Sequence, residues 1–346
     1  MSKLKVGIIG ASGYGGAELL RLLLTHNQVE VVGIYSRSYL GKPMHELYPV
    51  FYEISELVFS DEDALIAASD VIFASLPHGI SEPIARKCAD ANKRFIDLGA
   101  DFRLHDEADY EAWYNLPFKE KALHEQAVYG LSEIYPEQIK QANIVGNPGC
   151  YPTSIALAMY PLMKLDIDFD QHIIIDAKSG VTGAGKEPSE GSHFPNVNEA
   201  FHPYKVAEHR HTPEIEQTLS EMRNDTIHIT FVPHLLPVSR GIISTVYVKL
   251  KDAIALDDIH QHYVETYQTH RFVRVLEQGK MANLKYVQYS NYCDISVHYD
   301  KRTHTLIVVS AIDNMVKGAA GQAIQNMNLM YGFAEDEGLK LIPPSF

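Results

Sequence analysis

The sequence predicts an α/β protein, with an N-terminal doubly wound, Rossmann-like parallel sheet and a second α+β domain that carries a mixed or antiparallel sheet. Three observations support this fold class. Strand-like apolar runs alternate with helix-like segments up to about residue 165, as in parallel sheets. A glycine-rich turn joins the first strand to the first helix. Longer strand-like runs follow in the second half.

The first half of the chain alternates strands with helices. Residues 4–9 form a short apolar run that ends in glycines, residues 17–24 have the Leu, Ala and Glu content of a helix, and residues 29–35 are rich in β-branched side chains. The same alternation continues along the chain. We therefore expect strands over 70–76, 94–98 and 143–146, and helices over 61–68 and 81–91.

The second half of the chain has a different pattern, with longer expected strands. Strands are expected over 171–177, 227–232 and 242–250, with Pro233 and Pro237 interrupting the chain between the last two. A strand over 306–312 and a helix over 314–330 follow, and we expect this helix to return to the first domain. The predicted nucleotide-binding domain comprises residues 1–149 and 313–346, and the catalytic and oligomerisation domain residues 150–312.

Composition excludes several classes of protein. With 346 residues, 46% hydrophobic and 21% charged, the chain can form about two folded domains. Its formal net charge of −14 makes nucleic acids and anionic membranes poor partners. Three widely spaced cysteines without a CxxC pair argue against a disulfide framework. We see no signal peptide or membrane span and expect a cytoplasmic protein.

The glycine-rich turn lies where a dinucleotide fold binds the pyrophosphate. Its spacing is Gly10-x-x-Gly13-x-x-Gly16, because Ser12 occupies the position of the second glycine of the usual motif. Glycines let the backbone approach the phosphates, and the positive end of the helix dipole favours their charge. Since a strand, a helix and a second strand stand at the right distances, we expect a nucleotide site rather than a plain tight turn.

The end of the second expected strand selects the nucleotide. Enzymes specific for NAD usually have Asp or Glu here to bind the ribose 2′-hydroxyl, whereas this chain has Ser36, Arg37 and Ser38. A guanidinium flanked by hydroxyls can hold a 2′-phosphate, which a carboxylate would repel. We therefore expect NADP(H) as the cofactor. The alternative is that Arg37 is an exposed loop arginine.

Cys150 stands between a strand-like and a helix-like segment, in a Gly-Cys-Tyr-Pro sequence. At a helix N-terminus the dipole stabilises a thiolate, and backbone N–H groups are available to a developing oxyanion. Cys88 and Cys293 lie in ordinary helix-like and strand-like segments, where a buried and inert role is expected. Cys150 is therefore the candidate nucleophile.

A thiolate beside NADP(H) indicates that an acyl group becomes a thioester, which hydride transfer converts to an aldehyde. This chemistry needs a proton donor and acceptor. Either His209 or His211 could serve, just before a helix for which we expect Thr212 as N-cap and Pro213 as first residue. A His-x-His pair can also bind zinc, but no further carboxylate or thiol has ligand spacing, so we expect no metal.

Seven motifs occur in the order seen in a known family. They are Gly10-Ala11-Ser12-Gly13-Tyr14, Leu76-Pro77-His78-Gly79, Gly99-Ala100-Asp101-Phe102-Arg103, Gly149-Cys150-Tyr151-Pro152-Thr153, the loop 179–185, His209-Arg210-His211-Thr212-Pro213-Glu214 and Asp313-Asn314-Met315-Val316-Lys317-Gly318. Over nearly its whole length the chain resembles the N-acetyl-gamma-glutamyl-phosphate reductases, and specifically the longer type of that family.

The resemblance implies NADPH-dependent reduction of N-acetyl-gamma-glutamyl phosphate to N-acetylglutamate 5-semialdehyde and phosphate, the third step of arginine biosynthesis from glutamate. It makes Cys150 the nucleophile and places the acid–base group at His209 or His211, of which we prefer His209. It also implies a set of cofactor contacts. These are Gly10, Ser12, Gly13, Tyr14 and Gly15 at the pyrophosphate, Ser36, Arg37 and Ser38 at the 2′-phosphate, Pro77 beside the nucleotide, and Ser179, Gly180 and Asn314 near the nicotinamide.

The substrate of that reaction carries several negative charges. We expect Arg103, and also Arg240, to bind its carboxylate or phosphate. The alternative for both arginines is a salt bridge between domains. A homodimer or homotetramer is expected for a two-domain reductase of this plan.

Three other functions fit part of the pattern. An aspartate-semialdehyde dehydrogenase would share the two-domain plan, the thiolate and the cofactor, but the Gly-Cys-Tyr-Pro setting argues against it. A carrier-linked aminoadipyl-phosphate reductase would differ only in the loops that read substrate length. A non-catalytic NADP-sensing protein would not need Cys150, His209 and Arg103 together.

Overall fold

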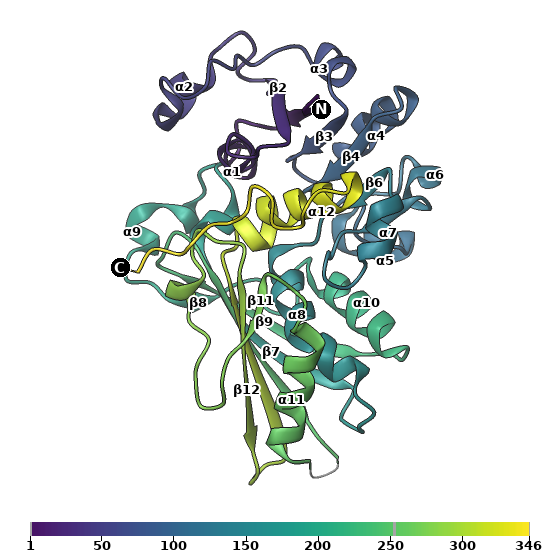
Figure 1. Ribbon diagram of the computed structural model, residues 1–346. Coiled ribbons are helices and arrows are strands. Elements are labelled where there is room, and N and C mark those ends of the chain that lie inside the picture. Colours follow the sequence, from purple (N-terminus) through teal and green to yellow (C-terminus); the bar gives the residue numbers. More distant parts are fainter. Residues whose placement is uncertain (1, 252–253, 346) are drawn as a thin grey trace. The chain divides into compact units, whose positions relative to one another are not determined.

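The structure, a computed structural model, describes residues 2–251 and 254–345. The chain forms two compact units (Figure 1). Unit 1 contains residues 2–148 and 319–340, and unit 2 contains residues 149–318 and 341–345. The first crossing between the units therefore comes directly before Gly149, and the second directly after Gly318.

The second crossing lies further along the chain than the expected boundary at residue 313, and the cause is local hydrogen bonding. Asp313 Oδ2 accepts the N–H of Tyr289 at 2.6 Å, and Asn314 Oδ1 accepts the N–H of Gly241 at 2.7 Å. Both partners belong to unit 2, so residues 313–318 are part of that unit. Residues 341–345 are also grouped with unit 2, although we expected them in the nucleotide-binding domain.

Unit 1 is built on a six-stranded parallel sheet with the order β2-β1-β3-β4-β6-β5, which confirms the predicted doubly wound fold. Its strands are β1 (Leu4–Ile9), β2 (Val29–Tyr35), β3 (Val71–Ala74), β4 (Arg94–Asp97), β5 (Ala127–Tyr129) and β6 (Ile144–Gly146). The strand order reverses between β1 and β3. Ligands of such sheets bind outside the carboxyl ends of the strands at this point.

The helices of unit 1 surround this sheet. They are α1 (Tyr14–Leu23), α2 (Met44–Leu47), α3 (Glu62–Ala68), α4 (Ser81–Asp90), α5 (Glu107–Tyr114), α6 (Lys121–His124), α7 (Pro136–Gln141) and α12 (Gly321–Tyr331). The last of them comes from the far end of the sequence and packs against α1 and α7. Gln322 and Asn326 of α12 donate to the carbonyl of Gly130 at 2.9 and 2.8 Å, which ties the helix to this unit.

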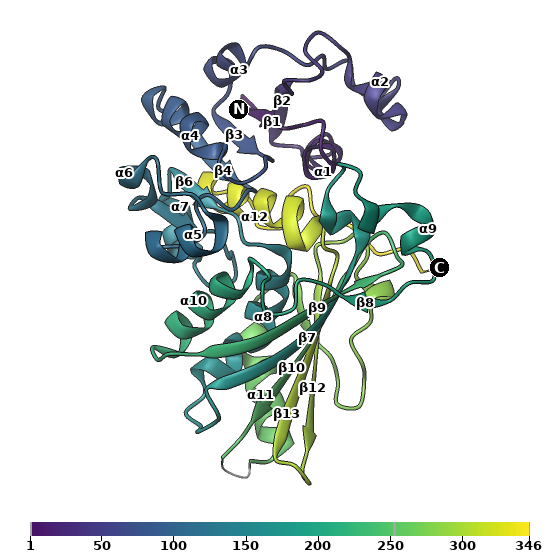
Figure 2. The same cartoon turned by 180° about the vertical axis from the view of Figure 1, so that it is seen from behind.

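Unit 2 contains a mixed seven-stranded sheet with the order β11-β12-β13-β10-β7-β9-β8, as predicted. Its strands are β7 (His172–Gly180), β8 (His202–Pro203), β9 (His228–Leu236), β10 (Ile242–Lys249), β11 (Val273–Val275), β12 (Cys293–Asp300) and β13 (Thr305–Ile312). Three longer helices pack on one face of this sheet (Figure 2). These are α8 (Cys150–Lys164), α10 (Thr212–Arg223) and α11 (Leu256–Tyr267), while α9 (Phe194–Val197) is a short separate turn.

Pro233 does not interrupt its strand, contrary to the expectation. β9 continues to Leu236, and Pro233 is paired in register with Ala177 of β7. The carbonyl of Pro233 accepts the N–H of Tyr204 at 3.0 Å, so the backbone polar groups of this residue face the short strand β8. The missing N–H therefore removes no bond to β7.

Helix α8 is supported from behind by tyrosines. Pro161 lies inside this helix and has no N–H, so the carbonyl of Leu157 lacks its usual helical partner. The hydroxyl of Tyr267 donates to this carbonyl at 2.6 Å. Tyr263 donates to the carbonyl of Ala158 at 2.9 Å. Helix α8 thus continues through its proline and is attached to α11.

Candidate functional site

The glycine turn lies at the carboxyl end of β1 and has the features of an anion cradle. Gly10 has φ +82°, and a Cβ at this residue would come within 2.2 Å of the carbonyl oxygen of Ser75. Gly13 is the N-cap of α1 and has no side chain with which to cap that helix. The N–H groups of the first turn therefore point to an acceptor outside the helix. This arrangement fits the pyrophosphate of a dinucleotide.

The loop after β2 is joined to the glycine turn by a contact between two serines. The hydroxyl oxygens of Ser12 and Ser36 lie 2.7 Å apart, and Arg37 and Ser38 follow as exposed residues. The hydroxyl of Tyr48 donates to the carbonyl of Ser12 at 2.9 Å. Sequence reasoning missed Tyr48, because nothing in the spacing between residues 12 and 48 indicates that they meet. The residues predicted to hold the 2′-phosphate thus adjoin those predicted to hold the pyrophosphate.

Arg103 lies at the carboxyl ends of the strands, on the side of the sheet where ligands bind. Its Nε donates to the carbonyl of Asn147, and its Nη2 donates to the carbonyl of Leu98, both at 2.8 Å. Leu98 and Asn147 directly follow β4 and β6. The guanidinium is therefore held at this edge by the backbone. Pro77 lies at the same edge, in the segment after β3.

Cys150 is the first residue of α8 and is half-buried. The N-cap of this fifteen-residue helix is Gly149, which has no side chain, and the positive end of the helix dipole lies at the thiol. A Cβ at Gly318 would come 2.8 Å from the Cβ of Cys150, which shows how closely the π-helical turn 316–320 packs against the cysteine. One turn later, Ser154 attaches the helix to the sheet, with its hydroxyl oxygen 3.0 and 2.6 Å from those of Ser244 and Ser310.

His211 contacts the residue that precedes Cys150. A Cβ at Gly149 would come 2.5 Å from the Nε2 of His211, so the imidazole packs directly on the glycine backbone. His211 itself is the N-cap of α10, and the helix therefore starts one residue earlier than expected, with Thr212 as its first residue rather than its cap.

Glu214 is a functional candidate that sequence reasoning missed. It is 1% exposed, and its Oε1 accepts the N–H of Gly149 at 2.8 Å. The bond fixes the backbone immediately before Cys150. The one signal available in the sequence was the position of Glu214 in the first turn of a helix that begins beside His211. Only the fold places that turn next to Gly149.

His209 lies among aromatic rings. The centroids of three rings are 5.6, 5.5 and 5.3 Å from that of its imidazole, and they belong to Tyr151, Tyr204 and Phe231. Burial, followed by the charges of Lys205 and Arg210, lowers the pKa of His209 to about 4. Its Nδ1 accepts the N–H of His211 at 3.2 Å. His209 is therefore neutral at neutral pH and holds the turn on which His211 stands.

Two phenols connect this turn to the loop that follows β7. The hydroxyl of Tyr204 donates to that of Tyr151 at 3.2 Å, and Tyr151 also hydrogen-bonds to Ser179. Burial raises the pKa of Tyr204 to about 12 and raises that of Tyr151 as well. Both phenols are therefore neutral. Through them, the surroundings of Cys150 are linked to one of the residues predicted to lie near the nicotinamide.

Asn314 ties two loops of unit 2 together. Its Oδ1 accepts the N–H of Gly241 at 2.7 Å, and its Nδ2 donates to the hydroxyl of Thr182 at 3.0 Å. The N–H of Gly180 donates to the carbonyl of Gly241 at 2.9 Å. These bonds fix Gly180 and Asn314 relative to one another. Both were predicted to lie near the nicotinamide.

Arg240 forms an ion pair inside unit 2. Its Nη1 lies 3.5 Å from the Oδ2 of Asp313, and its guanidinium lies 4.9 Å from the centroid of the Tyr289 ring. Asp313 is fully buried, and its Oδ1 accepts the N–H groups of Met315 and Val316. The arginine is thus held in one orientation beside the segment that leads to Gly318.

The structure gathers the predicted residues into two groups. Unit 1 contains Gly10, Ser12, Gly13, Tyr14, Gly15, Ser36, Arg37, Ser38, Pro77 and Arg103. Unit 2 contains Cys150, Ser179, Gly180, His209, His211, Arg240 and Asn314. The first group lies around the carboxyl ends of a parallel sheet. In the second group, His209 and His211 lie beside the N-terminus of α8, and Ser179 is bonded to Tyr151 in its first turn.

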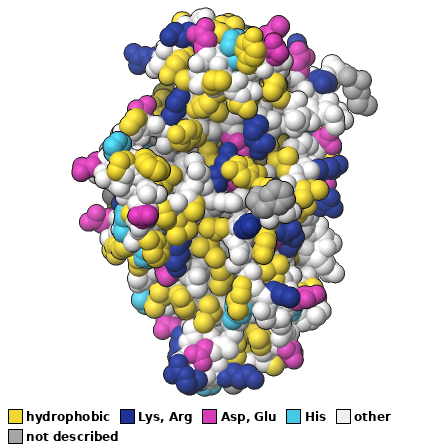
Figure 3. All heavy atoms as spheres, turned by 90° about the vertical axis from the view of Figure 1, so that its left-hand side faces the viewer, with side chains coloured by type: hydrophobic (Ala, Val, Ile, Leu, Met, Phe, Trp, Pro, Cys, Tyr) yellow, Lys and Arg dark blue, Asp and Glu magenta, His cyan; other side chains and the backbone are white. Residues whose placement is uncertain are grey.

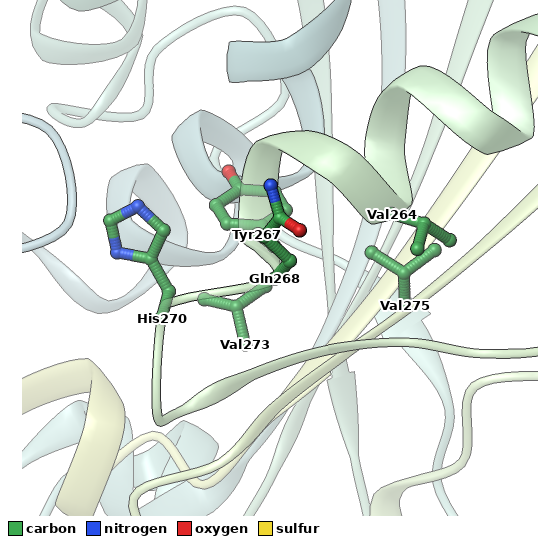
Figure 4. Close-up of a pocket in the computed structure, with 6 residues that line it drawn as sticks. All are labelled: Val264, Tyr267, Gln268, His270, Val273 and Val275. Atoms are coloured by element: carbon green, nitrogen blue, oxygen red, sulfur yellow. The ribbon is translucent and has the colours of Figure 1, made fainter.

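A separate hollow of about 230 Å³ lies between the end of α11 and the edge strand β11 (Figure 4). Its lining residues are Val264, Tyr267, Gln268, His270, Val273 and Val275. None of the predicted site residues is among them, and the hydroxyl of Tyr267 is bonded to the carbonyl of Leu157. We interpret the hollow as part of the packing of α11.

The surface of the chain is mixed in charge. On the face drawn in Figure 3, Lys and Arg side chains are interspersed with Asp and Glu. Within the described ranges, no helix has the length and apolar character needed to cross a lipid bilayer. Residues 2–251 and 254–345 contain no group of three or more His, Cys, Asp or Glu side chains arranged to hold a metal ion.

Comparison with known proteins matches both units to family models. Residues 5–142 match the NAD binding domain of semialdehyde dehydrogenases, and residues 150–314 match their dimerisation domain. An aspartate semialdehyde dehydrogenase II from Vibrio cholerae, complexed with ASA, superimposes with a TM-score of 0.74 at 17% identity, covering 96% of this chain and 99% of that one. The enzyme from Candida albicans, with NADP, gives 0.72 at 16% identity, covering 95% and 99%.

Fold and site therefore define an oxidoreductase of the semialdehyde dehydrogenase class. Among curated relatives, the N-acetyl-gamma-glutamyl-phosphate reductase of Brachyspira hyodysenteriae is 55% identical, over 99% of this chain and 100% of its own length. The reductases of Clostridium botulinum and Clostridium kluyveri are 52% and 51% identical over 99% of this chain, and over 100% and 99% of their own lengths. The chain belongs to the N-acetyl-gamma-glutamyl-phosphate reductase family.

Proposed function

We propose that this chain catalyses the NADPH-dependent reduction of N-acetyl-gamma-glutamyl phosphate to N-acetylglutamate 5-semialdehyde, with release of phosphate, as the third step of arginine biosynthesis. The observation that carries the proposal is Cys150 at the N-terminus of α8, with His211 packed on the preceding residue. The names of the relatives supply the substrate, and this geometry supplies the chemistry.

The cofactor is held at the carboxyl edge of the parallel sheet. The first-turn N–H groups of α1 and the hydroxyl of Ser12 bind the pyrophosphate, and Arg37 with its flanking serines binds the 2′-phosphate. NADPH bound there supplies a hydride. Ser179, Gly180 and Asn314 of unit 2 are the residues expected to contact the nicotinamide.

Covalent catalysis by Cys150 divides the reaction into two steps. The thiolate attacks the carbonyl carbon of the acyl phosphate, a C–S bond forms, and the C–O bond to phosphate breaks as phosphate leaves. The N–H groups of the first turn of α8 stabilise the oxyanion. After reduction of the thioester to a thiohemiacetal, the C–S bond breaks, the aldehyde leaves and the thiolate is restored.

His211 is the acid–base residue that accepts and donates the proton in these steps. Its Nε2 lies against Gly149, one residue from the thiol, whereas His209 is enclosed by aromatic rings and resists protonation. This assignment reverses our preference from the sequence. His209 and Glu214 are positioning residues, since they bond to the backbone N–H groups of His211 and Gly149.

Arg103 and Arg240 neutralise the anionic substrate. Arg103 is held at the ligand edge of the parallel sheet by the carbonyls of Leu98 and Asn147. Arg240 is oriented by its ion pair with Asp313. Both can offer N–H groups to a carboxylate or phosphate in a fixed geometry.

Arg37→Asp is expected to weaken NADP(H) binding by about a hundredfold while changing NAD(H) binding much less, because the new carboxylate repels only the 2′-phosphate. Fluorescence titration with NADPH and NADH measures both affinities. Arg302→Asp makes the same charge change at an arginine of unit 2 that is 83% exposed, and this matched control is expected to leave both affinities unchanged. An equal loss of affinity for the two nucleotides would show that Arg37 does not bind the 2′-phosphate.

The proposed reaction is tested in reverse with the purified chain. Phosphate-dependent reduction of NADP is followed with N-acetylglutamate 5-semialdehyde and aspartate semialdehyde side by side. We expect rapid turnover of the first and little of the second. A preference for aspartate semialdehyde would replace the proposal with that dehydrogenase. Binding of NADPH without turnover of either aldehyde would favour a non-catalytic sensor.

We further propose a cytoplasmic homodimer or homotetramer. The sheet of unit 2 has helices on one face, and its other face has partly exposed apolar side chains, among them Ile174, which is 48% exposed, Ile243 and Tyr247. A face of this kind is suited to an interface between copies. The family model that matches residues 150–314 carries the description of a dimerisation domain.

A further inference from the structure

Two buried carboxylates lie beneath the segment of unit 1 that carries Pro77. Asp97 is the last residue of β4, and Asp101 follows in the next loop. Both residues have an exposed fraction of 0%. Both side chains contact Ser81, the first residue of α4. The mechanism above uses neither carboxylate.

Asp101 has the hydrogen bonds of an anion. Its Oδ1 accepts the N–H of Gly79 at 2.6 Å and the hydroxyl of Tyr110 at 2.8 Å, and its Oδ2 accepts the N–H of Ser81 at 2.8 Å. Three donors thus hold this carboxylate in place. Two of these donors are backbone groups of the segment 77–81, so Asp101 fixes the path of that segment.

Asp97 has a different environment, although it contacts the same residue. Its Oδ1 accepts the hydroxyl of Ser81 at 2.7 Å and the N–H of Gly99 at 2.9 Å. Its Oδ2 is buried without a hydrogen-bond partner in the described part of the chain. A negative charge on that oxygen would be uncompensated, and a proton there would remove the charge. Burial, and next the charge of Asp101, raise the pKa of Asp97 to about 7.

Arg103, Tyr110 and Glu82 do not remove the reason for a proton on Asp97. Arg103, on the same loop, acts on Asp97 in the opposite direction, but burial and Asp101 have the larger effects. Tyr110 of α5 donates to Asp101, and its own pKa is raised by burial, so it remains neutral. Glu82 of α4 directs its Oε2 to the backbone N–H groups of residues 119 and 120.

We propose that the pair of Asp97 and Asp101 holds one proton and positions the segment 77–81, so that loss of this proton loosens the segment and weakens NADPH binding. When both groups are ionised, two adjacent buried anions repel one another across Ser81, whose hydroxyl donates to Asp97 and whose N–H donates to Asp101. The inference depends on the proposed nucleotide site beside Pro77. The proposal predicts that NADPH affinity falls at alkaline pH, and that this fall does not come from His209 or His211.

The test is the affinity for NADPH, measured by fluorescence from about pH 5.5 to about pH 9. For the unmodified protein we expect a loss of about five- to tenfold, centred near neutral pH. Asp97→Asn keeps an acceptor for Ser81 and cannot ionise, so its affinity should be independent of pH over this range. Asp101→Asn removes the charge that raises the pKa of Asp97, so the inflection should move to lower pH. It also removes one of the acceptor oxygens that hold the segment 77–81, so the affinity should be weaker. Asp294→Asn, a buried carboxyl of unit 2, should keep the unmodified profile.

Retention of the alkaline loss in Asp97→Asn would overturn the proposal. Infrared difference spectra of the cofactor-free protein supply a second measurement, which needs no variant to fold. A band from a protonated buried carboxyl should disappear as the pH rises through neutrality. Absence of that band at about pH 6 would show that the pair holds no proton. If the band titrates but NADPH does not bind, the proposed nucleotide site fails while proton sharing stands.

Discussion

Replacing Cys150 with Ser is expected to abolish turnover, lowering kcat by about 10⁴-fold or more, while NADPH affinity stays within about twofold. A serine hydroxyl does not ionise near neutral pH, and the dipole of α8 that favours a thiolate is too weak to produce an alkoxide. The predicted nucleotide contacts at the glycine turn lie in unit 1 and do not involve Cys150. Steady-state rates and a fluorescence titration with NADPH measure the two quantities.

Cys88→Ala is the matched control for this prediction. The Cys88 thiol is fully buried, and burial raises its pKa to about 12, so it should be unreactive. The control should keep the activity of the unmodified protein. Iodoacetamide should label Cys150 and inactivate the enzyme, with protection by substrate. Substantial activity in Cys150→Ser would exclude the thioester route.

His211→Asn is expected to lower kcat by about 10²- to 10⁴-fold and to remove the acidic limb of the kcat/KM profile. Its imidazole is the one packed on Gly149, beside the nucleophile. His209→Asn should have a smaller effect, because an asparagine oxygen can still accept the N–H of His211. Rates measured across the pH range for both variants check this.

The position of the acidic limb separates the two histidines. The pKa of His209 is lowered to about 4, so a limb that reports this group would be centred there. Loss of activity near pH 4, abolished by His209→Asn, would make His209 the acid–base residue and restore the preference drawn from the sequence. The same lowered pKa affects the stability of the fold. As the pH falls from about 6.5 to about 4, His209 becomes protonated in the unfolded chain but stays neutral in the folded one, so the folded state loses stability.

Much of the fold could be predicted because its signals are local. The run that became β1 was found with the bounds it has in the structure, as was β2, since β-branched alternation and a glycine boundary are properties of short segments. The short strand β5 was missed, because three residues carry too little periodicity. Pro233 was misread because the partner of a backbone group cannot be known before the sheet is formed.

The candidate site also contains residues that the sequence indicates and residues that only the fold reveals. Cys150, the glycine turn and the loop at Arg37 stand out because glycines, a lone thiol at a helix start and a guanidinium after a strand are visible in sequence. Glu214 and Asp97 were not assigned a role. Each acts through a hydrogen bond to a residue distant in the chain, Gly149 or Ser81, and no local pattern marks such a bond.

By itself, the sequence determined the class of fold and the chemistry of the cofactor and indicated Cys150 as the candidate nucleophile, because these depend on residue type and on spacing within one element. Only the tertiary structure decided which imidazole meets Gly149, which carboxylates are buried together and what holds α8 in place. Protonation and reactivity depend on burial and on neighbouring charges, and these arise only when segments far apart in the chain pack together.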